Sequence, residues 1–259
     1  MPTLNKWDIL SHPAIDWKPH VGQLVVAENP CRHKVLAAGR RFGKSYMGGA
    51  DKLLPEVFFT RPIANQLLLD GKKRVFWIVG PNFSDSEKEF RVIWNYLKKL
   101  EIPMNKPSYN NPETGDMIIT LWDGAMQIIA KSAQNPERLV GEGLSGVILS
   151  EAAKLKENIW PKYIRPTLAD FNGWSFSSSC LTADTLVWTD KGLVELGSMS
   201  SERTQGNYDD LYDTTVVGFH GSPETATKFY CNGIQDVLKV VGTNGAFGCR
   251  AHQERKKQF

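Results

Sequence analysis

Hydrophobic and polar positions follow two different patterns along this chain, and the first pattern extends to residue 179. Three short apolar runs are typical of buried strands, at 34–38, 74–81 and 146–149, and residues 173–179 look like one more central strand. Residues 83–100 predict an amphipathic helix whose apolar face carries Phe90, Ile93, Trp94 and Leu97. The runs 117–121 and 126–130, on either side of Asp123-Gly124, predict a hairpin. Strands that alternate with helices predict a mainly parallel sheet with flanking helices.

From residue 180 onward the chain follows an all-β pattern without a helical period. Short β-like runs alternate with turn signals such as Asp190-Lys-Gly192 and Cys231-Asn-Gly233. The runs lie at 185–189, 214–219 and 237–241. The change comes directly after Phe-Ser-Ser-Ser179, inside a predicted strand and with no linker. We therefore predict two domains, 1–179 and 180–259, of which the second is inserted into the fold of the first.

Composition and charge limit the number of domains and the kinds of binding partner that this chain can have. The 259 residues allow one large domain or two modest ones, and the 41% hydrophobic content is enough for real cores. The net charge of +3 divides into +5 for 1–179 and −2 for 180–259. This basic excess permits contact with a polyanion but is too small to establish DNA binding alone.

Two absences suggest the compartment. No apolar run approaches the length of a membrane span, and the N-terminus lacks the apolar stretch of a secretory signal. The four cysteines, at 31, 180, 231 and 249, have no zinc-like spacing. We expect a cytoplasmic, reduced protein without membrane contact, in which a cysteine can remain a reactive thiol.

A glycine-containing loop follows the first apolar run. Its sequence is Gly39-Arg-Arg-Phe-Gly43-Lys44-Ser45, and a helix-compatible stretch follows. Strand, glycine loop and helix are the context of a phosphate-binding loop. Gly39 and Gly43 would let the backbone approach phosphate, Lys44 would reach the β- and γ-phosphates of ATP, and Ser45 would ligate Mg²⁺. The strict spacing would place the first glycine at Ala38, so this loop is a variant; a plain basic loop before a helix is the alternative.

An acidic residue lies at the end of a second predicted strand. Gly146-Val-Ile-Leu is apolar, and Ser150 and Glu151 follow it. Because α/β sheets bind ligands at the C-terminal ends of their strands, Glu151 is predicted to orient water against the γ-phosphate. Ser150 stands where an Asp would hold Mg²⁺ through water. In the alternative interpretation, Glu151 is only the N-terminal acid of the next helix.

The first segment resembles the ATPase domain of phage terminase large subunits, the DNA-packaging motors. The residues that carry the resemblance are GRRFGKS, WIVGP, SAQNPERLVGEGLSGVILSEAA and GWSFSSS, in this order, and together they span nearly all of 1–179. The resemblance implies ATP hydrolysis coupled to translocation of double-stranded DNA into a prohead, with the portal and the small terminase subunit as partners, in the cytoplasm of an infected bacterial host. It also implies that Gln23 contacts adenine and that Arg40 stabilises phosphate charge; each could instead be an ordinary surface polar residue.

The segment departs from that family at three places. Many relatives have Asp where this chain has Ser150. Many carry an Arg just before Gly141, where this chain has Val140, with Arg138 two residues earlier. The family continues after GWSFSSS with a coupling segment and a nuclease domain, whereas this chain continues with CLTADTLVWTDKG.

The second segment resembles the N-terminal half of an intein, of the Hint type. CLTADTLVWTDKG is similar to an intein start with Cys180 as first residue, and VLKVVGTNGAFGCRAH is similar to the later block that delivers a histidine, here His252. Cys249 replaces the usual Thr of that block and offers a weak S–H donor. The Cys180 thiolate would attack the carbonyl of Ser179, and His252 would protonate the departing amide nitrogen. A non-catalytic β module is the alternative.

A complete intein ends in His-Asn, where Asn cyclisation releases it. This sequence ends at HQERKKQF, a few residues after His252. We therefore expect a trans-splicing system, in which a partner chain brings the C-terminal intein half and the rest of the terminase. A truncated or frameshifted reading frame gives the same ending. The rival interpretation of the whole chain is another P-loop nucleic-acid motor, such as a helicase, with a β-rich interaction module.

Overall fold

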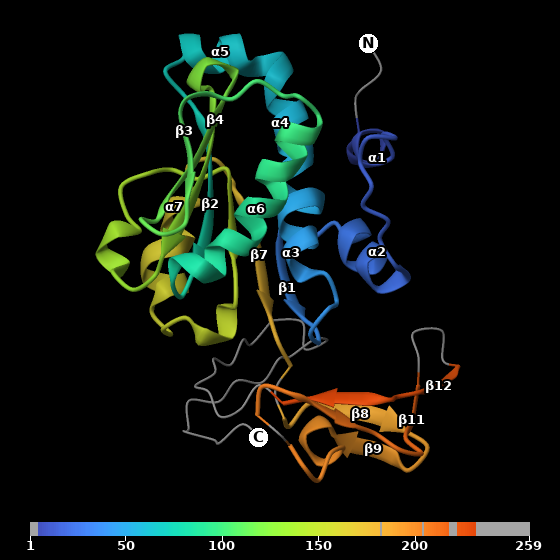
Figure 1. Ribbon diagram of the computed structural model, residues 1–259. Coiled ribbons are helices and arrows are strands. Elements are labelled where there is room, and N and C mark those ends of the chain that lie inside the picture. Colours follow the sequence, from blue (N-terminus) through green and yellow to red (C-terminus); the bar gives the residue numbers. More distant parts are fainter. Residues whose placement is uncertain (1–4, 182, 204, 218–221, 232–259) are drawn as a thin grey trace. The chain divides into compact units, whose positions relative to one another are not determined.

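The computed structural model describes residues 5–181, 183–203, 205–217 and 222–231 (Figure 1). The chain divides into two compact units. One comprises Met1–Leu36 and Arg41–Ser179, and the other comprises Ala37–Arg40 and Cys180–Phe259. Within the described residues, no helix is both long and apolar enough to cross a membrane.

A seven-stranded sheet forms the centre of the first unit, as far as the described residues show, in the order β1-β7-β6-β2-β5-β4-β3. The strands are β1 His33–Ala37, β2 Arg74–Gly80, β3 Asn105–Asn111, β4 Asp116–Leu121, β5 Met126–Ser132, β6 Gly146–Leu149 and β7 Trp174–Ser179. β2 runs parallel to β5 and to β6, and β6 runs parallel to β7. β4 is antiparallel to both β5 and β3. The predicted strands and hairpin are confirmed, but the sheet is mixed, because the chain returns through a tight turn between β4 and β5.

The principal helix of the first unit is α6, Phe83–Lys99. It begins where the Asn82 side chain accepts a hydrogen bond from the Asp85 N–H, at 2.9 Å, and it ends with Lys98 and Lys99 in its last turn. It packs on β2, on β5 and on the helix that follows the glycine loop (Figure 1). On the predicted apolar face, Phe90, Ile93 and Leu97 are fully buried, while Trp94 is half-buried and stacks on Phe90.

The helix after the glycine loop is continuous but changes its geometry. It starts as α3, Lys44–Tyr46, continues with π-helical geometry as η1, Met47–Leu53, and ends as α4, Leu54–Thr60. The shorter helical segments are α1 Lys6–Leu10, α2 Val21–Glu28, η2 Arg61–Ile63, α5 Ala64–Leu69, η3 Trp122–Gly124, η4 Pro136–Arg138, η5 Ala152–Lys154, η6 Ile159–Ile164, α7 Arg165–Thr167 and η7 Leu196–Ser198. All of them except η7 belong to the first unit.

A polar cluster links α4 to the N-terminal ends of β2 and β7. The Trp174 Nε1–H donates to Glu56 Oε1 at 2.9 Å, and the Arg74 guanidinium donates to Glu56 Oε2 at 3.1 Å. Burial raises the pKa of Glu56, and the charge of Arg74 only partly opposes it. The indole ring lies directly over Gly146, where a Cβ would come within 2.4 Å of its Cε2 atom. Only glycine fits beneath this ring.

The second unit contains short strands in its described part. β8 Leu186–Thr189, β9 Gly192–Glu195, β11 Thr215–Val217 and β12 Pro223–Thr225 form a sheet in the order β12-β11-β8-β9. β10 Tyr208–Asp210 pairs antiparallel with β13 Lys228–Tyr230. The predicted turn before Gly192 is confirmed, with Gly192, at a φ of 92°, as the first residue of β9. The predicted run 237–241 lies outside the described residues.

Candidate active site

Three strands bring the candidate residues together. β7 lies between β1, which precedes the glycine loop, and β6, which precedes Glu151. β6 and β7 are parallel, so their C-terminal ends meet at the same edge of the sheet. Their pairing runs from Gly146↔Trp174 to Leu149↔Ser177, so the last two residues of β7 extend beyond β6.

The glycine loop has a backbone that favours glycine at its end. Gly43 has a φ of 87° and immediately precedes α3, and Arg41 has a φ of 66°. A Cβ at position 43 would lie 2.4 Å from the Gln23 Nε2 atom. Lys44 and Ser45 therefore follow a turn that an L side chain at position 43 would disrupt. Gly39 and Arg40 belong to the second unit, and their roles in phosphate binding remain predictions of the sequence.

Gln23 is buried against this loop. Its Nε2 donates to the Phe42 carbonyl at 3.0 Å, and its Oε1 accepts from the His20 N–H, also at 3.0 Å. The side chain thus connects the start of α2 to the loop and holds its backbone in place. The sequence missed this role because it depends on a contact between residues far apart in the chain. The predicted contact of Gln23 with adenine remains a prediction.

Two hollows adjoin the loop. A pocket of about 270 Å³ is lined by Asp16, Trp17, Lys18, Gln23 and Tyr46. A second, of about 360 Å³, is lined by Asp16, Ser45, Tyr46, Lys88, Arg91, Val92, Asn95, Tyr96 and Lys99. Because both contain Asp16 and Tyr46, they are neighbours. Gln23, which the resemblance implies as an adenine contact, and Ser45, which is predicted to ligate Mg²⁺, thus line adjacent hollows.

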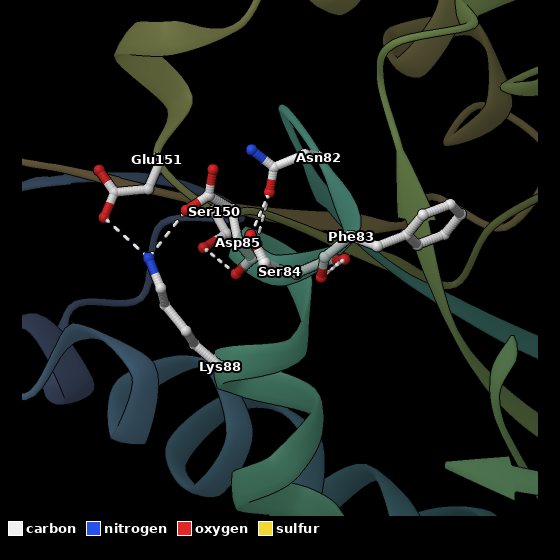
Figure 2. A network of polar contacts seen from close by, with 8 residues as sticks. Asn82, Phe83, Ser84, Asp85, Lys88, Ser150 and Glu151 are labelled. Atoms are coloured by element: carbon white, nitrogen blue, oxygen red, sulfur yellow. Dashed lines mark hydrogen bonds and ion pairs between the residues drawn. The ribbon is translucent and has the colours of Figure 1, made fainter. Parts of the chain in front are cut away.

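Glu151 follows β6 with a φ of 49°, and Lys88 of α6 holds its side chain. The Lys88 Nζ lies 3.7 Å from Glu151 Oε1 and 2.8 Å from Asp85 Oδ1 (Figure 2). Burial works to lower the pKa of Lys88, but the hydrogen bond to Asp85 and the charges of Asp85, Glu151 and Glu89 outweigh it and raise that pKa. The predicted base is therefore present at the strand end and paired with a lysine that the sequence did not single out.

Ser150 is buried beside these groups. Its N–H donates to the Val79 carbonyl at 2.9 Å, and its hydroxyl donates to the Asp85 carbonyl at 3.1 Å (Figure 2). Among the described residues, no group of three or more His, Cys, Asp and Glu side chains could hold a metal ion by itself. Mg²⁺ at such a site would need substrate phosphates as additional ligands, which is its usual mode in nucleotide-binding proteins.

Glu89 of α6 is a functional candidate that the sequence analysis missed. It is 1% exposed, and its Oε2 has no hydrogen-bond partner. Burial raises the pKa of Glu89 to about 7, and a hydrogen bond with Ser150 opposes the rise. Its position one residue before Phe90, on the buried side of the helix, was the signal that could have found it. A carboxyl group placed among apolar neighbours calls for an explanation.

Two residues of the predicted splicing junction, Ser179 and Cys180, are described at the end of β7. Ser179 is the last residue of β7, and its Oγ accepts a hydrogen bond from the Ala153 N–H at 3.3 Å. Cys180, the next residue, is half-buried. His252 and Cys249 lie outside the described residues, so their roles beside Cys180 remain predictions.

The sheet of the first unit is a mixed α/β sheet, and the glycine loop lies before α3 and the acid after β6, where the sequence predicts them. Two proteins with sequence similarity indicate a more particular class. The chain is 26% identical over 191 residues to the terminase large subunit of Thermus phage G20c, and 26% identical over 192 residues to that of Thermus virus P23-45. These matches support homology with terminase large subunits. Each covers 69% of this chain and 35% of the relative, so the chain spans about a third of their length.

A solved structure is also similar to part of this chain. The ATPase domain of the Thermus phage P74-26 large terminase aligns with a TM-score of 0.49 and 25% identity, over 64% of this chain and 66% of that one. No profile of a known protein family matches the chain.

Proposed function

We propose that the first unit is the ATPase part of a phage terminase large subunit, the motor that drives double-stranded DNA into a prohead with the portal and the small terminase subunit. One observation carries this proposal. In a chain similar to two phage terminase large subunits, the Gly43-Lys44-Ser45 turn starts a helix beside a sheet in which Glu151 follows the β6 strand by two residues.

Each residue has a defined part in this activity. Lys44 and the backbone amides after Gly43 bind the phosphates of ATP, and Arg40 neutralises their charge. Glu151 orients the attacking water and accepts its proton. Ser45 and, through water, Ser150 hold Mg²⁺, which when bound neutralises the phosphate oxygens. The buried, unpartnered Oε2 of Glu89 beside Ser150 fits a cation and its water shell in this region.

Nucleotide binding by the full chain tests the proposal. We expect a fluorescent ADP analogue to bind in the presence of Mg²⁺, and Lys44→Ala to weaken binding by about 10- to 100-fold, as the loss of a charged hydrogen bond predicts. Lys98→Ala, an exposed lysine in the last turn of α6, is the matched control and should bind like the native chain. Equal binding by native chain and Lys44→Ala would refute the assignment.

We further propose that residues 180–259 are the N-terminal fragment of an intein that splices through Cys180. The division of the chain into compact units after Ser179 supports this placement of the junction. In the first step, the Cys180 Sγ forms a bond to the Ser179 carbonyl carbon and the peptide C–N bond breaks. The nitrogen leaves as the α-amine of Cys180, which takes up a proton from His252. The product is a thioester.

A strong thiol at neutral pH tests this step. Dithiothreitol should release a fragment that ends at Ser179, identified by its mass. Cys180→Ala should abolish release, while Cys31→Ala, which removes an exposed thiol of the first unit, should leave it unchanged. Release from Cys180→Ala, or none from the native chain, would contradict the proposal.

The partner in this reaction is a second chain that brings the C-terminal intein half and the remainder of the terminase. Before splicing, we expect weak ATP binding through Lys44 and negligible motor activity. Robust DNA-stimulated ATP hydrolysis by this chain alone would contradict that expectation.

A further inference from the structure

We propose that the carboxylate of Glu89, on α6, binds the water shell of Mg²⁺. Ser150, which follows β6, has a hydroxyl group and offers no carboxylate for this role. This inference rests on the proposed ATPase function and adds a metal-positioning residue to the same site. It is carried by three observations: the burial of Glu89, its contact with Ser150, and its position against the helix that begins at Lys44.

The hydrogen bonds around Ser150 leave the Glu89 carboxylate incompletely satisfied. The single hydroxyl proton of Ser150 has two acceptors within reach, the Asp85 carbonyl at 3.1 Å and the Glu89 carboxylate. Glu89 Oε2 has no partner at all. A buried carboxylate in this condition is costly unless a cation or an ordered water completes its bonding. Mg²⁺ with its waters offers that completion, because carboxylate oxygens are its preferred protein ligands.

Two glycines bring Glu89 close to the phosphate-binding helix. A Cβ at Gly48, one turn after Ser45, would lie 2.8 Å from the Glu89 Cγ atom. A Cβ at Gly49 would lie 2.8 Å from the Glu89 carbonyl oxygen and 2.6 Å from the Val92 Cβ. Glycine at both positions lets α6 approach the helix closely. Glu89 thus lies between Ser150 and the helix that carries Ser45, the two residues predicted to hold the metal.

The neighbouring charges have other partners. Lys88, the next residue, is bound to Asp85 and Glu151. The Lys88 ammonium group is therefore the ion-pair partner of both Asp85 and Glu151. Glu89 is the acid of this group with an oxygen that lacks a hydrogen-bond partner, as far as the described residues show.

A charge-relocation cycle tests the proposal. Glu89→Gln removes the carboxylate, Ser150→Asp adds one at the end of β6, and the double variant moves the charge from one position to the other. Binding of Mn²⁺ in the presence of ADP is measured on the full chain from the loss of the electron-spin-resonance signal of free Mn²⁺. Binding of ADP in EDTA and thermal unfolding are measured beside it.

We expect Glu89→Gln to weaken Mn²⁺ binding by about 10- to 100-fold, the usual effect of losing an outer partner of a metal. ADP binding in EDTA should stay unchanged, and the double variant should regain Mn²⁺ binding to within about threefold of the native chain. Glu87→Gln, on the same helix, is the control and should bind Mn²⁺ normally.

Three results separate the possibilities. Native Mn²⁺ affinity in Glu89→Gln overturns the inference, and so does a weakened Glu89→Gln that the double variant fails to restore, since both indicate a merely structural carboxyl. A native chain that binds neither ADP nor Mn²⁺-ADP overturns the proposed function itself.

Discussion

Replacing Gly146 with alanine would drive a methyl group into the indole ring of Trp174. The new Cβ would lie 2.4, 2.7 and 2.8 Å from three ring atoms, Cε2, Cζ2 and Cδ2. These atoms belong to a rigid side chain whose Nε1–H is bound to Glu56 at 2.9 Å and whose face carries the Lys52 ammonium at 4.9 Å. The ring can move away only by breaking these contacts, so the substitution disturbs the whole cluster.

The cost can be estimated from three contributions. Overpacking of a tight site costs about 1–3 kcal/mol. Loss of the hydrogen bond from Trp174 to a charged Glu56 costs about 1.5–3 kcal/mol. Alanine restores about 0.5–1 kcal/mol, because glycine loses more conformational freedom on folding. We expect Gly146→Ala to reduce the free energy of unfolding by about 2–5 kcal/mol, much of the stability of an ordinary domain.

Urea unfolding followed by far-ultraviolet circular dichroism measures this loss. Gly39→Ala is the matched control for stability, since a Cβ there has no atom within 4 Å, and its unfolding midpoint should hardly change. A second comparison isolates the ring: on a Trp174→Ala background, Gly146→Ala should cost less than about 0.5 kcal/mol. If Gly146→Ala is equally costly with and without the indole, the steric explanation is wrong.

Three other predictions follow from the same structure. Burial raises the pKa of Glu56, so the folded chain takes up a proton on this carboxyl at higher pH than the unfolded chain. Acidification from pH 7 toward the ordinary carboxyl pKa should therefore increase the stability of the native chain relative to Glu56→Gln in urea titrations. Parallel dependences of stability on pH in the two proteins would contradict this prediction. Lys88→Met should lower stability by about 1–3 kcal/mol in thermal unfolding, because buried Asp85 loses its partner, whereas Arg91→Met, which breaks an exposed pair, should cost under about 0.5 kcal/mol. Gln23→Ala should weaken binding of a fluorescent ADP analogue by about tenfold, because the Phe42 carbonyl of the loop loses its hydrogen bond from a side chain that is itself anchored on the His20 N–H; unchanged affinity would show that the loop keeps its geometry without this support.

The centre of the first unit could be predicted from the sequence, because β2 and β6 are continuous apolar runs. β2 and β6 are buried over nearly their whole length, and such strands are visible in hydrophobicity alone. β3 was missed for the opposite reason. Its sequence, NKPSYNN, forms an edge strand beside β4 with no fully buried residue, so no alternation marks it.

The site was predictable where a local motif carries the chemistry and not where distant residues meet. Lys44, Ser45 and Glu151 follow strand ends, which sequence position alone reveals. Lys88 and Glu89 act from the middle of a helix toward residues about sixty positions away in the chain. Only the packing of α6 against β2, β5 and the glycine-bearing helix brings them to the site, and periodicity cannot distinguish such a contact from ordinary burial.

The way β7 ends has a consequence for what happens at the bond between Ser179 and Cys180. Pairing with β6 stops at Ser177, two residues before that bond. Cleavage or rejoining after Ser179 therefore breaks none of the ladder hydrogen bonds between β6 and β7. The β6–β7 part of the sheet can therefore keep its arrangement when the chain after Ser179 is replaced, so the candidate nucleotide site need not refold.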